Sequence, residues 1–412
     1  MTSLSVLLAT EGTYPYHRGG VSTWCHALTT QLAEIDFTLL AITMHPYLQS
    51  QYALAPNVRS VVTVPLWGTE DPAEYGHHHT FTDYLRRRWA TTSRDVERDY
   101  VPVYAAFLQE IATPGARSLA LGNILLGMHE HFHNFDYHRT HAYPSVWRTF
   151  VDVMLRAWHR THPDEPDPSL ADLVDASRLL FRLMLPLAAD VPRTDLTHSA
   201  AAAFCGLPCI IAKLQSKTPY LLTEHGVYLR EQYLNVGRSV KSPFVRWFLL
   251  RLMNAITDVN YAFADQISPV CQYNTRWELW RGVEPARIRV IYNGVNPDTF
   301  HPAPRTPNSR PTVVNVGLIF PLKGQLDLID AVGLVRQAVP DVELQMFGSP
   351  SDDDYYRECL RRVQNLGLEH HVTFAGTTKE PWTMLQRADV VALAQMLADW
   401  SPGKHMLLDL IA

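Results

Sequence analysis

A pair of glycines near the start of the chain stands where the backbone could approach a phosphate group. Gly19 and Gly20 end a loop that begins at Glu11, directly before a predicted helix. Glycine lets the backbone come close to a ligand, and the first turn of a helix offers unpaired N–H groups to an anion. A plain turn before a helix would have the same sequence, so the pair alone does not decide between the two interpretations.

A second glycine-containing loop carries a lysine. It begins at Asn315 after an apolar run, contains Gly317 and Lys323, and ends at Gly324 before a predicted helix. The ammonium group would then lie near the carboxyl edge of a sheet, where a point charge suits a diphosphate. The spacing differs from the G-x-x-x-x-G-K-[ST] pattern of the phosphate-binding P-loop. Lys323 could also be a solvated lysine at the start of a helix.

Polar residues also follow an apolar run at Thr223–Gly226, which contains Glu224 and His225. Reactive groups are common at strand ends, so His225 could hydrogen-bond a hydroxyl group or share a proton. A histidine that only caps a loop is the alternative. The stretch Asn293–Asn296 is a turn signal that many folds use.

A zinc-hydrolase pattern competes with these loops. Residues His129–His133 match H-E-x-x-H, and on a helix the first and last histidines would share a face. Further histidines follow at His138 and His141, and His77–His79 form a separate run. Five-residue patterns arise easily in a chain with 19 histidines. The segment also lies in a predicted helical insertion at residues 67–190, away from the ligand-binding cleft that we expect between two domains (both described below). Incidental metal binding is therefore the milder alternative.

The elements around the first loop predict a parallel sheet. Apolar runs at Ser5–Ala9 and Phe37–Thr43 are typical of buried strands. Between them, apolar residues recur at helical spacing from Val21 to Leu32. The order β-loop-α-β is typical of a doubly wound α/β fold.

The middle of the chain changes character. From about residue 67 to 190 helical periodicity dominates, which predicts a mostly helical insertion. Alternation of strands and helices then resumes. We expect strands at Leu196–Ser199, Tyr220–Thr223, Ala264–Val270 and Arg289–Tyr292, and helices at Ala200–Gly206 and Pro243–Thr257.

A proline-rich stretch at residues 301–311 is typical of a linker between domains. We therefore expect a first domain at residues 1–300 and a second at 312–412. The second repeats the α/β pattern, with predicted strands at Thr312–Val316, Glu343–Phe347, Val372–Phe374 and Val390–Ala394. Two such domains facing one another would enclose a cleft at the carboxyl ends of both sheets.

Taken in order, four motifs resemble glycosyltransferase family four, and more narrowly its PelF-type subgroup. They read E-G-T-Y-P-Y-x-R-G-G-V-S from Glu11, T-E-H-G-V-Y from Thr223, V-I-Y-N-G-V-N-x-x-x-F from Val290 and V-G-x-x-x-P-L-K-G from Val316. The resemblance implies the GT-B fold and a retaining hexosyltransferase. It further implies a nucleotide-diphosphate sugar donor such as a UDP-sugar, a glycan or polysaccharide acceptor, and no essential cofactor or metal.

The same resemblance assigns roles to residues. Gly19 and Gly20 would face the donor phosphates or the acceptor, and His225 would lie beside the donor sugar. Lys323, next to Gly317, would neutralise the leaving diphosphate, which gains charge as the glycosidic bond breaks. The further site residues that the resemblance suggests are Arg18, Glu224 and Asn293.

Two departures from the family bear on activity. Leu318 stands where the family usually has an arginine that helps to hold the diphosphate, a task that Arg18 could take over. After Leu393 the expected pair of glutamates is missing, and only Asp399 and Asp409 supply carboxylates. We therefore expect a coding sequence truncated or shifted in frame near residue 395. A catalytically impaired binding or assembly subunit is the alternative function.

Composition sets the remaining expectations. The 412 residues carry a net charge of −5, which gives no overall attraction to nucleic acid or anionic lipid. The five cysteines lack zinc-site spacing and fit a reducing compartment. The most apolar stretch, Phe244–Ala264, is interrupted by charges, so we expect a partly buried helix. A cytoplasmic protein follows, with at most a peripheral membrane or assembly-complex association.

Overall fold

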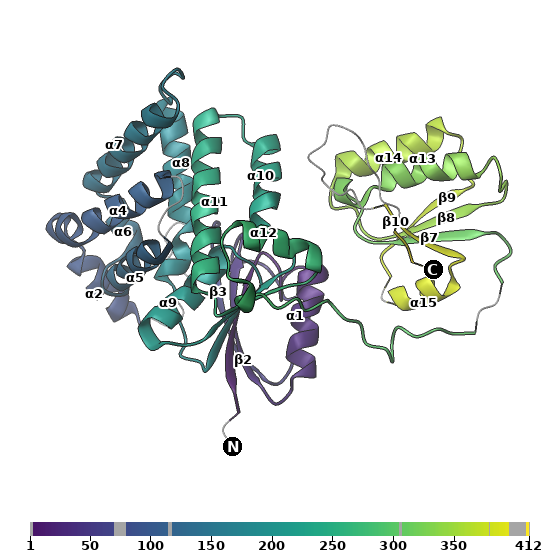
Figure 1. Cartoon of the computed structure of the whole chain (residues 1–412), viewed down its shortest axis with the longest axis horizontal. Coiled ribbons are helices and arrows are strands. Elements are labelled where there is room, and N and C mark those ends of the chain that lie inside the picture. The colour runs from purple at the N-terminus through teal and green to yellow at the C-terminus, as the bar shows by residue number, and fades with distance from the viewer. Residues whose placement is uncertain are drawn as a thin grey trace. The chain divides into compact units, whose positions relative to one another are not determined.

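The structure is a computed structural model that describes residues 3–69, 80–113, 118–304, 307–378, 380–394 and 409–411. His77–His79 and Asp399 lie outside these residues. The chain forms two compact units, Met1–Asn293 and Gly294–Ala412, and each is described by itself. Figure 1 shows that each unit has its own sheet and its own helices.

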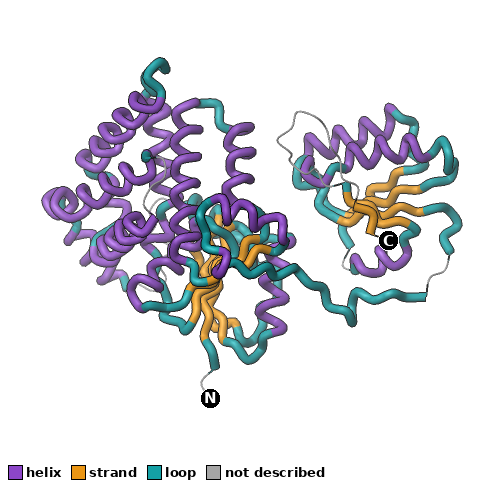
Figure 2. Tube along the Cα trace, viewed as in Figure 1, coloured by secondary structure: helices purple, strands orange, loops and turns teal. Residues whose placement is uncertain are grey.

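The first unit contains a parallel sheet of six strands in the order β3-β2-β1-β4-β5-β6. Figure 2 shows these strands as one layer with helices packed against it. The strands are β1 (Ser5–Glu11), β2 (Asp36–Thr43), β3 (Val58–Pro65), β4 (Leu196–Ser199), β5 (Tyr220–Glu224) and β6 (Gln266–Pro269). The crossover from β3 to β4 passes over β1, as in Rossmann-like folds.

Burial on both faces explains why β1 and β2 read as continuous apolar runs. Most of their residues are buried, as expected for central parallel strands. The strand β3 was missing from the sequence-based expectations because it lies at the edge of the sheet. Its first half carries the exposed residues Arg59 and Ser60, which break the apolar pattern.

Helices occupy the stretch between β3 and β4, where the sequence predicts a helical insertion. The α-helices here are α2 (Phe81–Ala90), α3 (Ser93–Asp95), α4 (Val101–Ala112), α5 (Ser118–Asn134), α6 (Tyr137–His141), α7 (Pro144–Thr161) and α8 (Leu170–Leu183). A π-helical turn, Val96–Tyr100, joins α3 to α4, and a 3-10 turn, Leu185–Ala188, follows α8. One hydrophobic core runs from these helices into the sheet.

Other helices of the first unit connect its strands. They are α1 (Gly20–Gln31), α9 (Leu207–Ser216), α10 (Tyr228–Ser239), α11 (Pro243–Phe263) and α12 (Thr275–Trp280). The long helix α11 contacts α4, α5, α8, α9 and α10, so it joins the insertion to the rest of the unit (Figure 1). Within the described residues, no helix combines the length and the apolar character needed to span a bilayer.

Two expected elements were wrong. A helix at Ala200–Gly206 does not form; a 3-10 turn covers Phe204–Gly206, and α9 begins at Leu207. The reason is Pro208, which a helix accepts only in its first turn. The expected strand Arg289–Tyr292 is instead an extended stretch beside β6. Ile288, just before it, forms an isolated bridge with Ile267, and the N–H groups of Arg289 and Ile291 donate to Ile267 O and Pro269 O at 2.9 and 3.0 Å.

The second unit contains a smaller sheet, whose strand order is β11-β10-β7-β8-β9. Its strands are β7 (Thr312–Val316), β8 (Glu343–Phe347), β9 (Val372–Gly376), β10 (Val390–Leu393) and β11 (Asp409–Ile411), of which β11 alone pairs antiparallel. Its helices are α13 (Gln325–Val335), α14 (Asp353–Asn365) and α15 (Pro381–Arg387). The predicted fold class, two Rossmann-like α/β units that each have their own largely parallel sheet, is therefore confirmed.

The turn before α9 generates a stability prediction. A Cβ atom at Gly206 would overlap Asn260 Oδ1. That buried side chain accepts a bond from Tyr220 Oη (2.6 Å) and donates to Ala203 O (3.0 Å). We expect Gly206→Ala to lower the free energy of unfolding by about 3 kcal/mol, because the network must break.

Denaturant unfolding measures this effect, with Gly237→Ala in α10 as the control. A Cβ atom at Gly237 meets nothing within 4 Å, so alanine there should stabilise by about 0.5–1 kcal/mol. Equal effects of the two substitutions would contradict the expected role of the Asn260 network.

Candidate functional site

The carboxyl ends of the first unit's strands form one edge of the sheet. Neighbouring strands β1, β4, β5 and β6 are parallel, so their last residues lie along the same edge, where α/β proteins bind ligands. These last residues are Glu11, Ser199, Glu224 and Pro269. Three of the predicted site residues lie at this edge. Gly19 and Gly20 stand at the start of α1, which follows β1, and His225 directly follows β5.

Gly19 and Gly20 leave open space at the start of α1. Both are exposed, and Gly19 caps the helix without a side-chain hydrogen bond. A Cβ atom at either position would meet nothing within 4 Å. Packing therefore does not require glycine here, and the bare backbone presents the first N–H groups of the helix to a ligand. Arg18, just before the pair, is exposed as well.

His225 packs against the helix that these glycines begin. The centre of its ring lies 4.6 Å from that of Trp24 in α1, edge to face. Trp24 also contacts His198 of β4, whose Nε2 lies 2.8 Å from Thr223 Oγ1. Burial lowers the pKa of His225 to about 4 and that of His198 to about 3. Both imidazoles are therefore neutral near pH 7.

One ring nitrogen of His225, the buried Nε2, has no hydrogen-bond partner within the described residues. A buried polar atom without a partner is costly, and a hydroxyl group bound at this edge could satisfy it. The structure thus brings Gly19, Gly20 and His225 to one sheet edge through Trp24.

Glu224 has different partners from its neighbour His225. Its side chain is fully buried and accepts hydrogen bonds from Tyr261 Oη in α11, at 2.7 and 2.9 Å. The backbone N–H of Tyr228, at the start of α10, also donates to this carboxyl group. Glu224 therefore ties β5 to two helices, and its contacts are structural.

A second buried carboxyl group, Glu278 of α12, lies against Glu224. Glu278 is also fully inaccessible, and neither oxygen of its carboxyl group has a hydrogen-bond partner within the described residues. Burial raises the pKa of both Glu224 and Glu278, and the proximity of Glu278 raises that of Glu224 further. Two adjacent buried carboxyl groups cannot both ionise at low cost, so we expect the pair to hold one proton between them. Sequence spacing gave no signal of this pair.

Glu11 is a further residue that the sequence-based expectations did not select, although it opens the first motif. Part of the residue remains accessible, but protein surrounds the carboxyl group, and Oε2 accepts a bond of 3.2 Å from the backbone N–H of Cys205. Burial raises the pKa of Glu11 to about 7, against the lowering effect of the Cys205 and Phe204 N–H groups. A carboxyl group that titrates near neutrality at a strand end is a candidate for proton exchange.

The second unit places Gly317 and Lys323 at the carboxyl end of β7. Lys323 ends a 3-10 turn, Pro321–Lys323, and its aliphatic stem passes about 4 Å from where a Cβ of Gly317 would stand. Burial lowers the pKa of Lys323 from its ordinary value. The side chain therefore reaches back over the glycine loop.

Buried contacts hold this loop in place. Gln325, fully buried at the start of α13, donates to Leu318 O at 2.9 Å. Gly324 has a left-handed backbone (φ 64°), and a Cβ there would overlap the carbonyl of Ala394. Glycine is required at this position because the chain approaches another backbone so closely. Leu318 is 37% exposed.

The remaining predicted residue, Asn293, is exposed at the last position of the first unit. The structure therefore sorts the predicted residues into two groups. Gly19, Gly20 and His225 share the edge of the first sheet, and Gly317 and Lys323 share that of the second.

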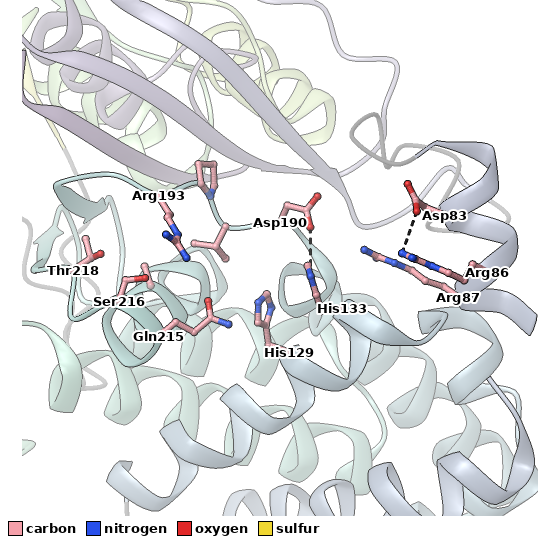
Figure 3. Close-up of a pocket in the computed structure, with 13 residues that line it drawn as sticks. Asp83, Arg86, Arg87, His129, His133, Asp190, Arg193, Gln215, Ser216 and Thr218 are labelled. Atoms are coloured by element: carbon pink, nitrogen blue, oxygen red, sulfur yellow. Dashed lines mark ion pairs between the residues drawn. The ribbon is translucent and has the colours of Figure 1, made fainter. Parts of the chain in front are cut away.

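The H-E-x-x-H segment lines a pocket of about 610 Å³ in the first unit (Figure 3). His129 and His133 both face it, 6.4 Å apart between ring centres, whereas Glu130 is exposed and is not part of the lining. The pocket includes Thr218, just before β5, so it lies at the amino edge of the sheet. Within the described residues, no group of three or more His, Cys, Asp or Glu side chains is placed to hold a metal ion.

Glu11 generates a pH prediction. Its pKa is 4.5 in an unfolded chain and about 7 in the folded protein, so the folded state binds more protons between these values. The contribution of Glu11 to stability is therefore lost as pH rises from 4.5 through 7. We expect Glu11→Gln to gain up to about 3 kcal/mol in unfolding free energy over the wild type as pH rises above 7.

Unfolding curves at several pH values measure this difference, with Glu34→Gln at an exposed position as the control. The control should show no such change with pH. A difference for Glu11→Gln that stays constant across the range would contradict the raised pKa.

The carboxyl pair generates a second prediction. Glu278→Gln should change the unfolding free energy at neutral pH by less than about 1 kcal/mol, because an amide N–H replaces the shared proton. Glu278→Ala should cost about 2–4 kcal/mol, because it leaves a cavity and removes the partner of Glu224. Chemical denaturation compares the two variants. A glutamine as damaging as the alanine would argue against a shared proton.

Comparison with known proteins agrees with this division into two parts. Residues 4–286 match the family described as Domain of unknown function (DUF3492), and residues 297–399 match Glycosyl transferases group 1. A GDP-mannose-dependent alpha-(1-6)-phosphatidylinositol monomannoside mannosyltransferase of Mycobacterium tuberculosis is 30% identical over 187 residues, 43% of each chain. An alpha-maltose-1-phosphate synthase of Mycolicibacterium smegmatis is 24% identical over 217 residues, 49% of this chain and 52% of the relative.

The chain thus spans about half the length, or less, of these curated relatives. Among solved structures, Anabaena HepE in complex with UDP is similar over 95% of this chain and 74% of its own, with 14% identity and a TM-score of 0.48. Because the first family match covers more than half of the chain, the protein belongs to the family described as Domain of unknown function (DUF3492), and its second unit carries a Glycosyl transferases group 1 domain.

Proposed function

We propose that the protein is a retaining glycosyltransferase that moves a sugar from a UDP-sugar to a glycan or polysaccharide acceptor. One observation carries the proposal: Gly317 and Lys323 lie together at the carboxyl end of β7, inside the segment that matches Glycosyl transferases group 1. The backbone of this loop is held by a contact that does not depend on a ligand, from Gln325 to Leu318 O.

The chemistry requires stabilisation of the leaving diphosphate. As the glycosidic bond breaks, negative charge grows on the departing phosphate oxygens, and positive charge already aimed at them lowers the barrier. Lys323 supplies that charge, and the first N–H groups of α13 add partial positive charge. No metal is part of this proposal.

The first unit contributes polar groups of low charge. The neutral His225, whose buried Nε2 has no hydrogen-bond partner within the described residues, accepts a hydrogen bond from or donates one to a sugar hydroxyl. The bare backbone at Gly19 and Gly20 lets a second ligand group approach α1.

Leu318 favours a second candidate function, a binding or assembly subunit with impaired catalysis. An apolar side chain that is 37% exposed stands beside Gly317, so the loop has one cation fewer than the family pattern. Turnover of a nucleotide sugar separates the two functions, because only the enzyme hydrolyses or transfers the donor.

Free cysteines support a cytoplasmic location. All five are unpaired, and four of them are buried. Reduced buried thiols are usual in a reducing compartment, which is also where we propose that the donor is used.

A donor screen tests the proposed function. Calorimetry with UDP-glucose, other UDP-sugars and GDP-mannose should show saturable binding to one donor class, and donor hydrolysis should show turnover. If the protein binds none of these donors, the proposal that it is a glycosyltransferase is wrong, and the binding or assembly subunit remains as the candidate function.

Lys323→Ala sharpens the same test. Removing one charge from the leaving group should lower kcat about 10²-fold or more, with weaker donor binding. Lys241→Ala, at an exposed position of the first unit, is the matched control and should keep wild-type kinetics. Undiminished turnover in Lys323→Ala would remove this lysine from the mechanism.

A further inference from the structure

A pocket of about 1020 Å³ opens on the first unit between the insertion and the helices α10, α11 and α12. Its walls come from the ends of α4 and α5, from one face of α11 and from the segment Trp280–Arg287 after α12. None of Gly19, Gly20 and His225 lines it. It is therefore distinct from the candidate site at the sheet edge.

The charges on the walls of this pocket are balanced. Arg281 holds Asp258 through two N–H···O bonds of 2.7 and 2.5 Å, and Arg287 donates to the carbonyl of Ala262 at 3.2 Å. The lining contains three arginines and three acidic residues: Arg251, Arg281, Arg287, Glu110, Asp258 and Glu284. The carboxylates would repel a polyanionic ligand. An acyl chain would remove water from the charged side chains without replacing their hydrogen bonds, which costs free energy. A neutral ligand rich in hydroxyl groups fits this wall.

Two aromatic side chains line the pocket with much of their surface exposed. Trp280 is 69% exposed and Tyr233 is 44% exposed. The hydroxyl of Tyr233 accepts a hydrogen bond from Asn254 Nδ2 at 3.0 Å, which holds the ring in place. A sugar ring has an apolar C–H face that packs on an aromatic ring, and a hydroxyl edge that bonds planar polar groups.

We propose that this pocket binds a neutral oligosaccharide. Trp280 and Tyr233 stack on its sugar rings, and Asp258, Arg281 and Asn254 bond its hydroxyl groups. The proposal rests on the proposed function in one respect, since it assigns the oligosaccharide to the part of the acceptor chain beyond the reacting sugar.

One side chain joins this pocket to the candidate site. Tyr261 lines the pocket, and its hydroxyl donates to Glu224, the residue before His225. A glycan held in the pocket would therefore lie against the same helix that fixes the end of β5. This connection suits an acceptor that extends from the sheet edge.

Saturation-transfer NMR and tryptophan fluorescence test the proposal with short neutral oligosaccharides of glucose, galactose, mannose and N-acetylglucosamine. We expect saturable binding to at least one of them by the full chain. Trp280→Ala should weaken it about tenfold or more, and Trp280→Phe should weaken it less because a ring remains.

Trp89→Ala is the matched control, because Trp89 is 70% exposed in α2 and does not line the pocket. It should bind as the wild type does, and circular dichroism should confirm that every variant is folded. Failure of all the oligosaccharides to bind, or equal binding by Trp280→Ala, would overturn the proposal, as would binding to anionic glycans alone.

Kinetic measurements show whether the bound oligosaccharide is part of the acceptor chain or a separate effector molecule. If it is the acceptor chain, Trp280→Ala raises KM for long acceptors and leaves KM for short ones unchanged. If it is a separate effector, adding it changes kcat with a short acceptor. Donor binding measured on the same samples separates this proposal from the proposed function, because loss of donor binding leaves oligosaccharide binding intact.

Discussion

Burial of ionisable groups without opposite charges is the constraint that shapes the edge of the first sheet. The carboxyl groups of Glu11, Glu224 and Glu278 are surrounded by protein, and so are the imidazoles of His198 and His225. Burial favours the uncharged form of each group. Apart from the exposed Arg18, the edge is consequently polar but carries little fixed charge near neutral pH. In the proposed mechanism the charge that faces the diphosphate comes from Lys323 of the second unit.

The helical insertion matters to this edge through α11. Its buried side chains pack against insertion helices α4, α5 and α8, while Tyr261 near its end fixes Glu224. Packing far from β5 therefore sets the position of the residue that precedes His225. The insertion is part of the scaffold of the site, although none of its residues is among those proposed to touch the donor.

The parallel strands could be predicted because both of their faces are buried, so that their sequences are nearly continuous apolar runs. The edge strand β3 could not, since exposed residues such as Arg59 interrupt its pattern. Gly19, Gly20 and His225 stood out because short motifs contain them. Glu278 and Tyr261 did not, because their importance comes from contact with Glu224 between separate elements. Glu11 was visible in its motif, but the N–H group that meets it lies 194 residues along the chain.

The position of the insertion also affects how the protein is made. On the ribosome β1, β2 and β3 emerge first, but the other neighbour of β1 is β4, which follows the whole insertion. At about 5–20 residues per second, synthesis of the insertion takes on the order of ten seconds. Throughout that interval one side of β1 has unpaired backbone groups and could pair with another nascent chain. We therefore expect the yield of native chain to depend on how fast the insertion helices fold during synthesis and on chaperones that bind such edges.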